Sequence, residues 1–368
     1  MIENRKEILK MRFELLKLVR GFFWQKGFLE VETPLVVASP DMEPTLTPFE
    51  TAIFNEKKEK FSAALITSPE YAMKKMLAAG FEKIFQICKC FRNNEPFGGL
   101  HNPEFTMIEW YRVRSDYVDI MRDVEDLFLF LLKKSYYQNS KSKICPFGTS
   151  PEGRQNLTTN NQQPTTLVYQ GNKINISLPW ERISVCEAFK KYAGIDLRNN
   201  LDVKLLGERA KKIGCTVTKN DNFSDVFFKI FLTKIEKNLG KNKPTFIYDY
   251  PIQMASLSRP KPNDKKFAER FELYIAGREI ANAFSELTDS KEQLARIKKD
   301  VAERKKLRKT IFPIDYDFID AVGKIPPSAG IALGLDRLFM ILLDVRDIND
   351  IIPFPAVEIF KIRNKISN

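Results

Sequence analysis

The spacing of apolar residues near the start of the chain predicts a long helix over residues 4–26. Apolar side chains recur there at steps of three and four, which places them on one face of an amphipathic helix. Gly27 follows directly and is well placed to end the helix. The apolar positions of this face are Ile8, Met11, Leu15, Leu18 and Phe22.

The rest of the chain alternates between strand-like and helical patterns. Helices are predicted over residues 68–80, 117–134, much of 181–240 and 291–309. Strands are predicted over residues 28–34, 83–95, 101–113, 243–251 and 269–284, and a strand that passes into an apolar helix is predicted over 329–345. Strands separated by helices favour an α+β fold, with an antiparallel sheet flanked by helices.

Residues 138–170 differ from the rest of the chain in composition. Ser, Thr, Asn, Gln, Pro and Gly are enriched in this segment. A segment of this kind buries too little apolar surface to offset the entropy of ordering it. We therefore expect a surface insert here, partly mobile.

Composition excludes some classes of protein and leaves others open. With 368 residues, 43% of them hydrophobic, the chain can bury a large core, and no apolar run reaches the length of a membrane span. The net charge of +12 favours an acidic partner (nucleic acid, an acidic protein or ATP), but solvated lysine faces explain it equally well. The five cysteines contain no CxxC pair, which favours reduced thiols in the cytoplasm.

The single histidine, His101, limits the possible chemistry. A Ser-His-Asp triad would have to use it, and the chain has no GxSxG elbow. The chain also lacks the GxxxxGK[ST] phosphate loop. If the protein is an enzyme, its chemistry is expected to depend on carboxylates, arginines and a metal ion.

A pair of glutamates in residues 269–284 predicts a site for a divalent cation. If residues 276–277 form a two-residue turn, Tyr274 faces Glu279 across the hairpin, and Glu272 lies one diagonal step away, about 7–8 Å between Cα atoms. Two carboxylates without a nearby base are costly unless a cation lies between them. Mg²⁺ fits, because it takes few protein oxygens and completes its shell with phosphate and water. The alternative is an exposed hairpin with ordinary glutamates.

Two arginines are candidates for phosphate binding. Arg92 shares a strand face with Asn94, and the return strand presents Glu109 and Tyr111. A guanidinium suits phosphate because its planar fork bonds two oxygens at once. Arg337 lies where a strand enters a helix, a place where nucleotides are often bound. The alternative is a salt-bridged hairpin with a structural histidine in its loop.

The order of these segments resembles that of the three motifs of the class II aminoacyl-tRNA synthetases. Their residues resemble those of the lysyl branch. The segments that carry the resemblance are TSPEYAMKKMLAAG, FRNNE, HNPEFTMIEWYR, ERFELYIAGREIANAFSEL and GLDRL. The resemblance covers nearly the whole chain except the polar insert. It implies one catalytic domain over residues 1–368, interrupted at about 138–170, and a homodimer.

Two features resemble the short paralogues that attach (R)-β-lysine to elongation factor P. The first is the local sequence of two segments, HNPEFTMIEWYR and KPTFIYDYPIQMASLS, together with Ala332, where tRNA-charging relatives tend to have glycine. The second is that the motif 1 helix begins within the first ten residues, which leaves no room for an N-terminal anticodon-binding barrel. We therefore expect elongation factor P as the acceptor, without specific tRNA binding and without a membrane.

The resemblance also implies roles for individual residues. Arg92 and Arg337 would be catalytic, with Arg92 on the α-phosphate of ATP and Phe105 and Arg337 on either side of adenine. Glu272 and Glu279 would hold Mg²⁺. The further residues implied for ATP are Asn93, Asn94, Glu95, His101, Asn102, Ile280 and Gly334. Those implied for the amino acid are Ser68, Pro69, Glu70, Glu109, Tyr111, Asn282, Glu286 and Ala332.

The chain departs from the family in motif 2. The usual Arg-x-Glu places a glutamate where this chain has Asn94, and Glu95 comes one residue later. Either a bulge brings Glu95 into place, or Asn94 accepts with its amide oxygen. The usual loop arginine is also absent from PFGGL.

These observations predict a ligase that forms an aminoacyl-adenylate of (R)-β-lysine or lysine from ATP and transfers the acyl group to a lysine of elongation factor P. Two alternatives remain. One is a truncated lysyl-tRNA synthetase that charges tRNA, and the other is a non-catalytic paralogue that binds a nucleotide and regulates.

Overall fold

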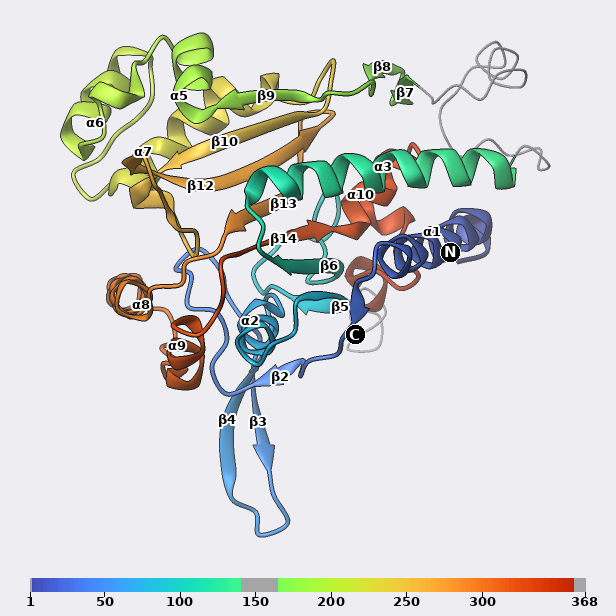
Figure 1. Cartoon of the computed structure of the whole chain (residues 1–368), viewed down its shortest axis with the longest axis horizontal. Helices are drawn as coiled ribbons and strands as arrows, with labels where there is room; N and C mark the ends of the chain where they lie inside the picture. The colour runs from blue at the N-terminus through green and yellow to red at the C-terminus, as the bar shows by residue number, and fades with distance from the viewer. Residues whose placement is uncertain (1, 140–164, 361–368) are drawn as a thin grey trace, which may run out of the picture.

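The fold is built on one large, mainly antiparallel sheet. The computed structural model describes residues 2–139 and 165–360. Within them, nine strands form a sheet in the order β1-β5-β6-β14-β13-β12-β10-β9, with β11 beside β12 (Figure 1). Only the edge pairs β1–β5 and β9–β10 are parallel. The α+β class with an antiparallel sheet, predicted from the sequence, is thus confirmed.

The strands of this sheet are β1 (Leu29–Glu30), β5 (Lys83–Phe91), β6 (Glu104–Val113), β9 (Glu181–Ser184), β10 (Thr245–Pro251), β11 (Pro260–Lys261), β12 (Asp264–Ile275), β13 (Arg278–Ser285) and β14 (Ser328–Gly334). Two smaller sheets consist of β2 (Val36–Val37), β3 (Glu50–Phe54) and β4 (Lys60–Leu65), and of β7 (Thr166–Tyr169) and β8 (Asn172–Asn175).

Helices pack on both sides of the sheet (Figure 1). The main core lies between the sheet and the helices α1, α3 and α10. A second core joins α2, α8 and α9 to the edge around β5 and β6. The helices are α1 (Lys6–Gln25), α2 (Glu70–Ala78), α3 (Tyr117–Asn139), α8 (Ser290–Lys306), α9 (Tyr316–Val322) and α10 (Leu335–Leu342).

A helical layer follows β9 and covers the far end of the sheet. It has its own apolar core, in which the aromatic rings of Phe189, Phe227 and Phe231 pack together. This layer accounts for the helices expected within residues 181–240, although the segment opens with the strand β9. Its elements are α5 (Val185–Ala188), the π-helical turn η2 (Phe189–Ala193), η3 (Leu197–Asn199), α6 (Val203–Lys212), α7 (Phe223–Ile230), the π-helical turn η4 (Phe231–Ile235) and η5 (Glu236–Asn238).

Most expected elements are present, with small differences in detail. In α1, Leu15 and Phe22 are buried as expected. Ile8, Met11 and Leu18 are only partly buried, because the buried stripe is centred slightly to one side of them. The strand expected over residues 28–34 is reduced to the two residues of β1.

The expected surface insert needs correction at its ends. Helix α3 continues to Asn139, and β7 begins at Thr166. The side chains of Leu167 and Tyr169 are 1% and 4% exposed and belong to the main core, so this end is not a surface loop. Residues 140–164, the middle of the expected insert, lie outside the described residues.

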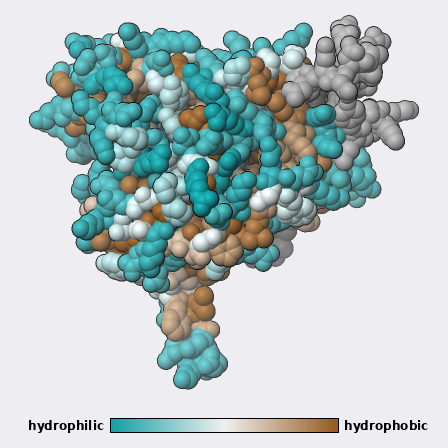
Figure 2. Space-filling model, in the orientation of Figure 1, coloured by the Kyte–Doolittle hydropathy of each residue, from teal (hydrophilic) through white to brown (hydrophobic). Residues whose placement is uncertain are grey.

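The hairpin of β3 and β4 forms an arm that projects from the body of the protein (Figure 1). Ile53 and Phe61 face each other across its two strands and are 50% and 52% exposed. Figure 2 shows apolar surface along this arm and a hydrophilic tip. The arm therefore presents apolar side chains to water.

Within the described ranges, no helix has the length and apolar character needed to cross a lipid bilayer.

Candidate active site

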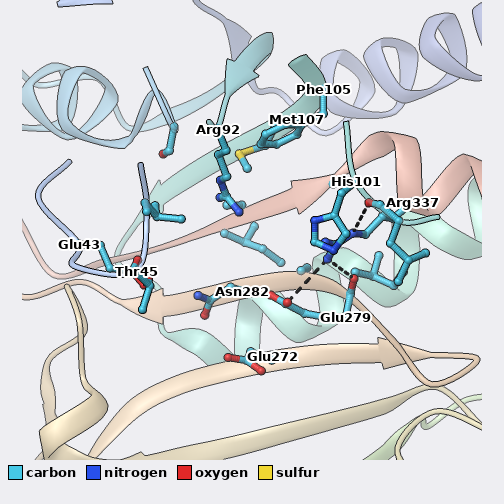
Figure 3. Close-up of a pocket in the computed structure, with 18 of the residues that line it drawn as sticks. Glu43, Thr45, Arg92, His101, Phe105, Met107, Glu272, Glu279, Asn282 and Arg337 are labelled. Atoms are coloured by element: carbon cyan, nitrogen blue, oxygen red, sulfur yellow. Dashed lines mark hydrogen bonds and ion pairs between the residues drawn. The ribbon is translucent and has the colours of Figure 1, made fainter. Parts of the chain in front are cut away.

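One cavity of about 390 Å³ lies over the middle of the sheet. Its floor comes from the central strands β6, β12, β13 and β14, and its walls come from the loop at residues 41–46, the loop at 92–102 and the helical layer. Figure 3 shows side chains from these separate segments pointing into the same space. The cavity has a basic end and an acidic end, and the two differ in the groups they offer a ligand.

The basic end contains both arginines predicted from the sequence. Arg92 follows β5, and its guanidinium lies 5.1 Å from the ring centre of Phe105 on β6. The Nε atom of Arg92 is buried and has no hydrogen-bond partner among the described residues. A buried donor without a partner is costly, so this position favours an anionic ligand.

Arg337 comes from α10, close behind the end of β14. It donates from Nη1 to the backbone oxygen of Glu279 at 3.1 Å, and the same nitrogen lies 3.7 Å from the Glu279 carboxylate (Figure 3). Its Nε donates to the backbone oxygen of Leu100 at 3.4 Å. Arg337 thus links β13 to the loop that carries His101, on the opposite side of the cavity from Arg92.

The histidine loop shows which of the two motif 2 candidates, Asn94 or Glu95, lines the cavity. The Nδ1 atom of His101 lies 2.7 Å from Oε2 of Glu95, and this hydrogen bond is the main cause that lowers the pKa of Glu95. Glu95 lines the cavity, whereas Asn93 and Asn94 do not. Asn94 has a φ of 61°, a left-handed conformation that Asn tolerates, and this extra residue brings Glu95 inward. Asn93 and Asn94 are therefore not placed where the resemblance implied.

The carboxylate hairpin has the expected turn and an unexpected bulge. Residues 276–277 form the turn, and Tyr274 faces Glu279 as predicted. The register then shifts between Leu273 and Tyr274, so that Glu272 pairs with Asn282 across the strands. Ile280 is the extra residue of the bulge, and it lines the cavity.

The expectation that no base lies near this pair is wrong. Oε1 of Glu272 lies 2.7 Å from Nη2 of Arg270, and its Oε2 accepts from the Tyr274 hydroxyl at 3.0 Å. Arg270 stands two residues before Glu272, hence on the same strand face. Among the described residues, the carboxylate of Glu279 has only the distant contact with Arg337, and burial, followed by the charge of Glu272, raises its pKa.

The acidic end brings together side chains from strand β6, from the start of helix α2 and from the residue that follows β13. Glu109 is 1% exposed, and it accepts hydrogen bonds from Ser68 and, at 2.8 Å, from the Tyr111 hydroxyl. Burial, with a smaller contribution from the charge of Glu70, raises the pKa of Glu109 to about 8. At neutral pH this carboxyl is therefore mainly protonated.

Glu286 lies deeper and keeps one oxygen without a partner. Burial raises its pKa to about 7, although the nearby Lys74 ammonium opposes this. Its Oε2 lies 2.6 Å from Nζ of Lys74, while Oε1 has no hydrogen-bond partner in the part of the chain that the structure describes. A side chain at Gly330 would place its Cβ 2.8 Å from this Oε1. Because Gly330 lines the cavity and has no side chain, Oε1 is within reach of the cavity floor.

Most of the predicted site residues meet in this cavity. Three others lie behind or beside its lining, since Glu109 and Glu286 are buried below it and Pro69 precedes helix α2. Asn102 lines the cavity, but its amide bonds the backbone at Glu104 and Ala356, which is a structural role. The predicted residues that line the cavity are Ser68, Glu70, Arg92, Glu95, His101, Asn102, Phe105, Tyr111, Glu272, Glu279, Ile280, Asn282, Ala332, Gly334 and Arg337.

Some residues of the site were missed in the sequence. Arg270 was detectable, because it stands two positions from Glu272 in a strand. The pairing of Lys74 with Glu70 was detectable, since the two lie one helical turn apart, but its burial against Glu286 was not. Glu43 and Thr45, in the loop at residues 41–46, also line the cavity, but no sequence motif points to them (Figure 3). The same holds for the wall residues Phe228, Phe231, Leu232 and Glu236.

Comparison with known proteins places this fold and cavity in one family. Residues 1–358 match the family model of the class II tRNA synthetases for D, K and N. An elongation factor P–(R)-β-lysine ligase from Avibacterium paragallinarum is 35% identical over 351 residues, which are 95% of this chain and 95% of that protein.

Lysine–tRNA ligases are similarly close in identity but longer. The protein from Pelotomaculum thermopropionicum is 35% identical over 357 residues, which are 96% of this chain and 64% of that protein. The protein from Campylobacter jejuni is 35% identical over 364 residues, 98% of this chain and 65% of that protein. The chain thus spans slightly less than two thirds of the length of these tRNA ligases. With its family model matched over nearly its whole length and its sheet built as the sequence motifs implied, the chain belongs to the class II tRNA synthetases of the D, K and N group.

Proposed function

We propose that this protein is an ATP-dependent ligase that activates (R)-β-lysine, or lysine, as an aminoacyl-adenylate and transfers it to a lysine side chain of elongation factor P. The observation that carries the proposal is the unpartnered Oε1 of Glu286 near the floor of a cavity whose other end holds Arg92 and Arg337. One end is suited to an ammonium and the other to phosphates, as an adenylate of a lysine-like amino acid requires.

The first step is proposed to take place at the basic end. A carboxylate oxygen of the amino acid attacks the α-phosphorus of ATP, the bond to the β-phosphate oxygen breaks, and pyrophosphate leaves. Arg92 and Arg337 approach this region from opposite walls, so together they can balance the charge that develops on the phosphoryl oxygens. Phe105 offers a ring for adenine, and Glu95 stands where it can accept from the adenine amino group.

The amino acid is proposed to point its terminal ammonium toward Glu286, with the Tyr111 hydroxyl and Glu109 beside it. Glu70 and Ser68 also line the cavity and suit the backbone end of the substrate. In the second step the neutral amine of an acceptor lysine attacks the adenylate carbonyl, AMP leaves, and the amine loses a proton. Positioning of the two reactants supplies much of the acceleration.

The residues present fit Mg²⁺ as an ion shared with phosphates. Glu279 is the available ligand, because both oxygens of Glu272 already have partners. No group of three or more His, Cys, Asp or Glu suited to a metal occurs among the described residues. Mg²⁺ needs only one or two carboxylates when phosphates complete its shell, and its charge would offset that of the departing pyrophosphate.

The isomer is proposed from Ala332. This residue lies on β14 between Glu109 and Asn282 on the neighbouring strands, and its methyl group lines the cavity. A methyl group here shortens the space for the backbone end of the substrate. This supports a preference for the β-isomer, whose amine is displaced by one carbon from the carboxylate.

The acceptor is proposed from the comparisons. The chain covers 95% of a relative named as an elongation factor P ligase, against 64% of a lysine–tRNA ligase at equal identity. We also propose a homodimer in the cytoplasm. The apolar arm of β3 and β4 supports a dimer, because Ile53 and Phe61 would leave water if a second copy covered them.

The test offers both acceptors in one reaction with ATP, Mg²⁺ and radiolabelled (R)-β-lysine or lysine. We expect label on elongation factor P, more from (R)-β-lysine than from lysine, and little on tRNA. Label mainly on tRNA would support a truncated tRNA ligase. No pyrophosphate exchange with either isomer would support the non-catalytic alternative.

Replacing Glu279 by Gln is expected to lower ATP–pyrophosphate exchange at least about 100-fold, because the amide removes the negative charge proposed to hold Mg²⁺ against the phosphates. The remaining exchange is expected to need a higher Mg²⁺ concentration. A matched control is Glu292→Gln, an exposed glutamate paired with Arg296 on α8. Undiminished exchange in Glu279→Gln would remove Glu279 from the proposed metal site.

A further inference from the structure

Lys74 is a fully buried lysine beside the acidic end of the cavity. It lies on α2, is 1% exposed and does not line the cavity itself. Its Nζ is 2.6 Å from Oε1 of Glu70 and 2.6 Å from Oε2 of Glu286. Glu70 is one helical turn away, whereas Glu286 comes from the end of the β13 strand region, 212 positions later in the chain. The ammonium therefore joins two elements that the sheet alone does not connect.

The charge of Lys74 is maintained by these partners. Burial alone would lower its pKa, but the charges of Glu286 and Glu70 outweigh burial and raise it. The ring of Phe284, which also lines the cavity, lies 5.9 Å from Nζ. A buried ammonium with two carboxylate partners is held firmly, because leaving its place would separate it from both of them.

The same contacts determine how the two carboxylates point. Lys74 takes Oε2 of Glu286, and the other oxygen of that carboxylate is left facing Gly330 at the cavity floor. Lys74 also takes Oε1 of Glu70, a residue that lines the cavity. Each carboxylate thus has one oxygen committed to the internal ammonium.

The geometry of this cluster leaves room for one more cation. Glu70 and Glu286 share the single ammonium of Lys74, and Oε1 of Glu286 has no hydrogen-bond partner among the described residues. A terminal ammonium of a ligand is a suitable partner for this oxygen. Without Lys74, the two carboxylates would lose the cation that lies between them.

We propose that Lys74 is a positioning residue for the amino acid: it holds Glu70 and Glu286 so that each presents one oxygen to the substrate, and it adjusts the charge of the pocket to accept one terminal ammonium. This inference rests on the proposed function, in which Glu70 and Glu286 bind a lysine-like amino acid. It assigns no direct contact between Lys74 and the substrate.

The experiment is ATP–pyrophosphate exchange with (R)-β-lysine and lysine in the Lys74→Met variant. The KM for the amino acid is expected to rise about 10- to 100-fold, as for a loss of roughly 1.4–2.8 kcal/mol of binding. The KM for ATP is expected to stay within about twofold, because the cluster lies at the other end of the cavity. A fall in kcat alone, with both KM values unchanged, would overturn the proposal.

Lys75→Met is the matched control. Lys75 is the next residue of α2, and its Nζ is 2.6 Å from Asp315, so this variant also breaks an ion pair between helices. Lys75 does not line the cavity or contact its carboxylates. We expect unchanged KM values in this control. An equal rise in the amino-acid KM would show that any loss of helix anchoring produces the effect.

A double-mutant cycle separates positioning from general destabilisation. If Lys74 acts through Glu286, Lys74→Met is expected to have little further effect on kcat/KM in a Glu286→Gln background. If the effects of the two substitutions on kcat/KM are fully additive, the proposal is overturned. If Lys74→Met does not fold, the Lys74→Arg variant is used instead, because arginine keeps the positive charge but displaces the carboxylate oxygens. A raised KM for the amino acid in this variant supports the proposal. An unchanged KM overturns it.

Failure of the proposed function gives a different result. In that case the unmodified protein shows no exchange with either lysine isomer. Exchange by the unmodified protein together with an unchanged amino-acid KM in a folded Lys74→Met variant contradicts only the role of Lys74.

Discussion

Glu286→Gln is expected to lower the activation of the amino acid, measured as kcat/KM in pyrophosphate exchange, by at least about 100-fold. Glu286 is 1% exposed and provides the one buried carboxylate oxygen at the cavity floor that has no partner among the described residues. Loss of one member of a buried charge pair costs about 2–5 kcal/mol. The neutral amide keeps the shape of the side chain, so the change mainly removes charge.

The fold is expected to survive this substitution, because Lys74 keeps its second partner, Glu70. The melting temperature and the affinity for ATP, measured by titration calorimetry, serve as controls. Lysine activation within about twofold of the unmodified protein would show that the terminal ammonium binds elsewhere. A loss of ATP binding as well would mean that the substitution disturbs the whole cavity.

Gly330→Ala is expected to abolish activation of lysine isomers while ATP binding remains. A Cβ atom at this position would lie 2.2 Å from two ring carbons of Tyr111 and 2.8 Å from Oε1 of Glu286. Real atoms do not approach so closely, so the tyrosine ring must move or the strand must shift. Overpacking of this kind costs about 1–3 kcal/mol of stability, and it displaces two groups proposed to receive the ammonium.

Gly207→Ala is a suitable control for this substitution. Gly207 lies in α6, outside the cavity lining, and an added Cβ would make only an ordinary contact with Val217 at 3.5 Å. Alanine in a helix interior is expected to be neutral or slightly stabilising. Wild-type exchange kinetics in Gly330→Ala would contradict the placement of Tyr111 and Glu286 at the substrate end.

The sequence alone determined the α+β class, the order of the elements and most residues of the cavity. The reason is local. Apolar spacing, strand alternation and the turn at residues 276–277 depend on near neighbours in the chain, so Tyr274 was correctly paired with Glu279. Arg92 and Arg337 were placed at the site by the motifs that resemble the class II synthetases, and both line the cavity; their role on phosphates stays a prediction.

Only the tertiary structure decided how the charges are paired. The bulge at Ile280 changes the partner of Glu272, and Arg270 occupies a carboxylate that the sequence left free for a metal. Asn94 and Glu95 were equal alternatives until the backbone conformation placed Glu95 inside. These outcomes depend on register and on backbone dihedrals, which single-residue patterns do not specify.

The ends of the polar insert and the buried lysine show the same limit. Leu167 and Tyr169 were assigned to a surface loop by the composition around them, yet they pack into the main core. Lys74 looks like an ordinary helix-surface lysine in the sequence, but it meets Glu286 across 212 positions of chain. Whether a charged side chain is solvated or buried depends on what the fold places against it. That contact is long-range, so the sequence determined the elements of this site, and the packing of the sheet against α2 decided its electrostatics.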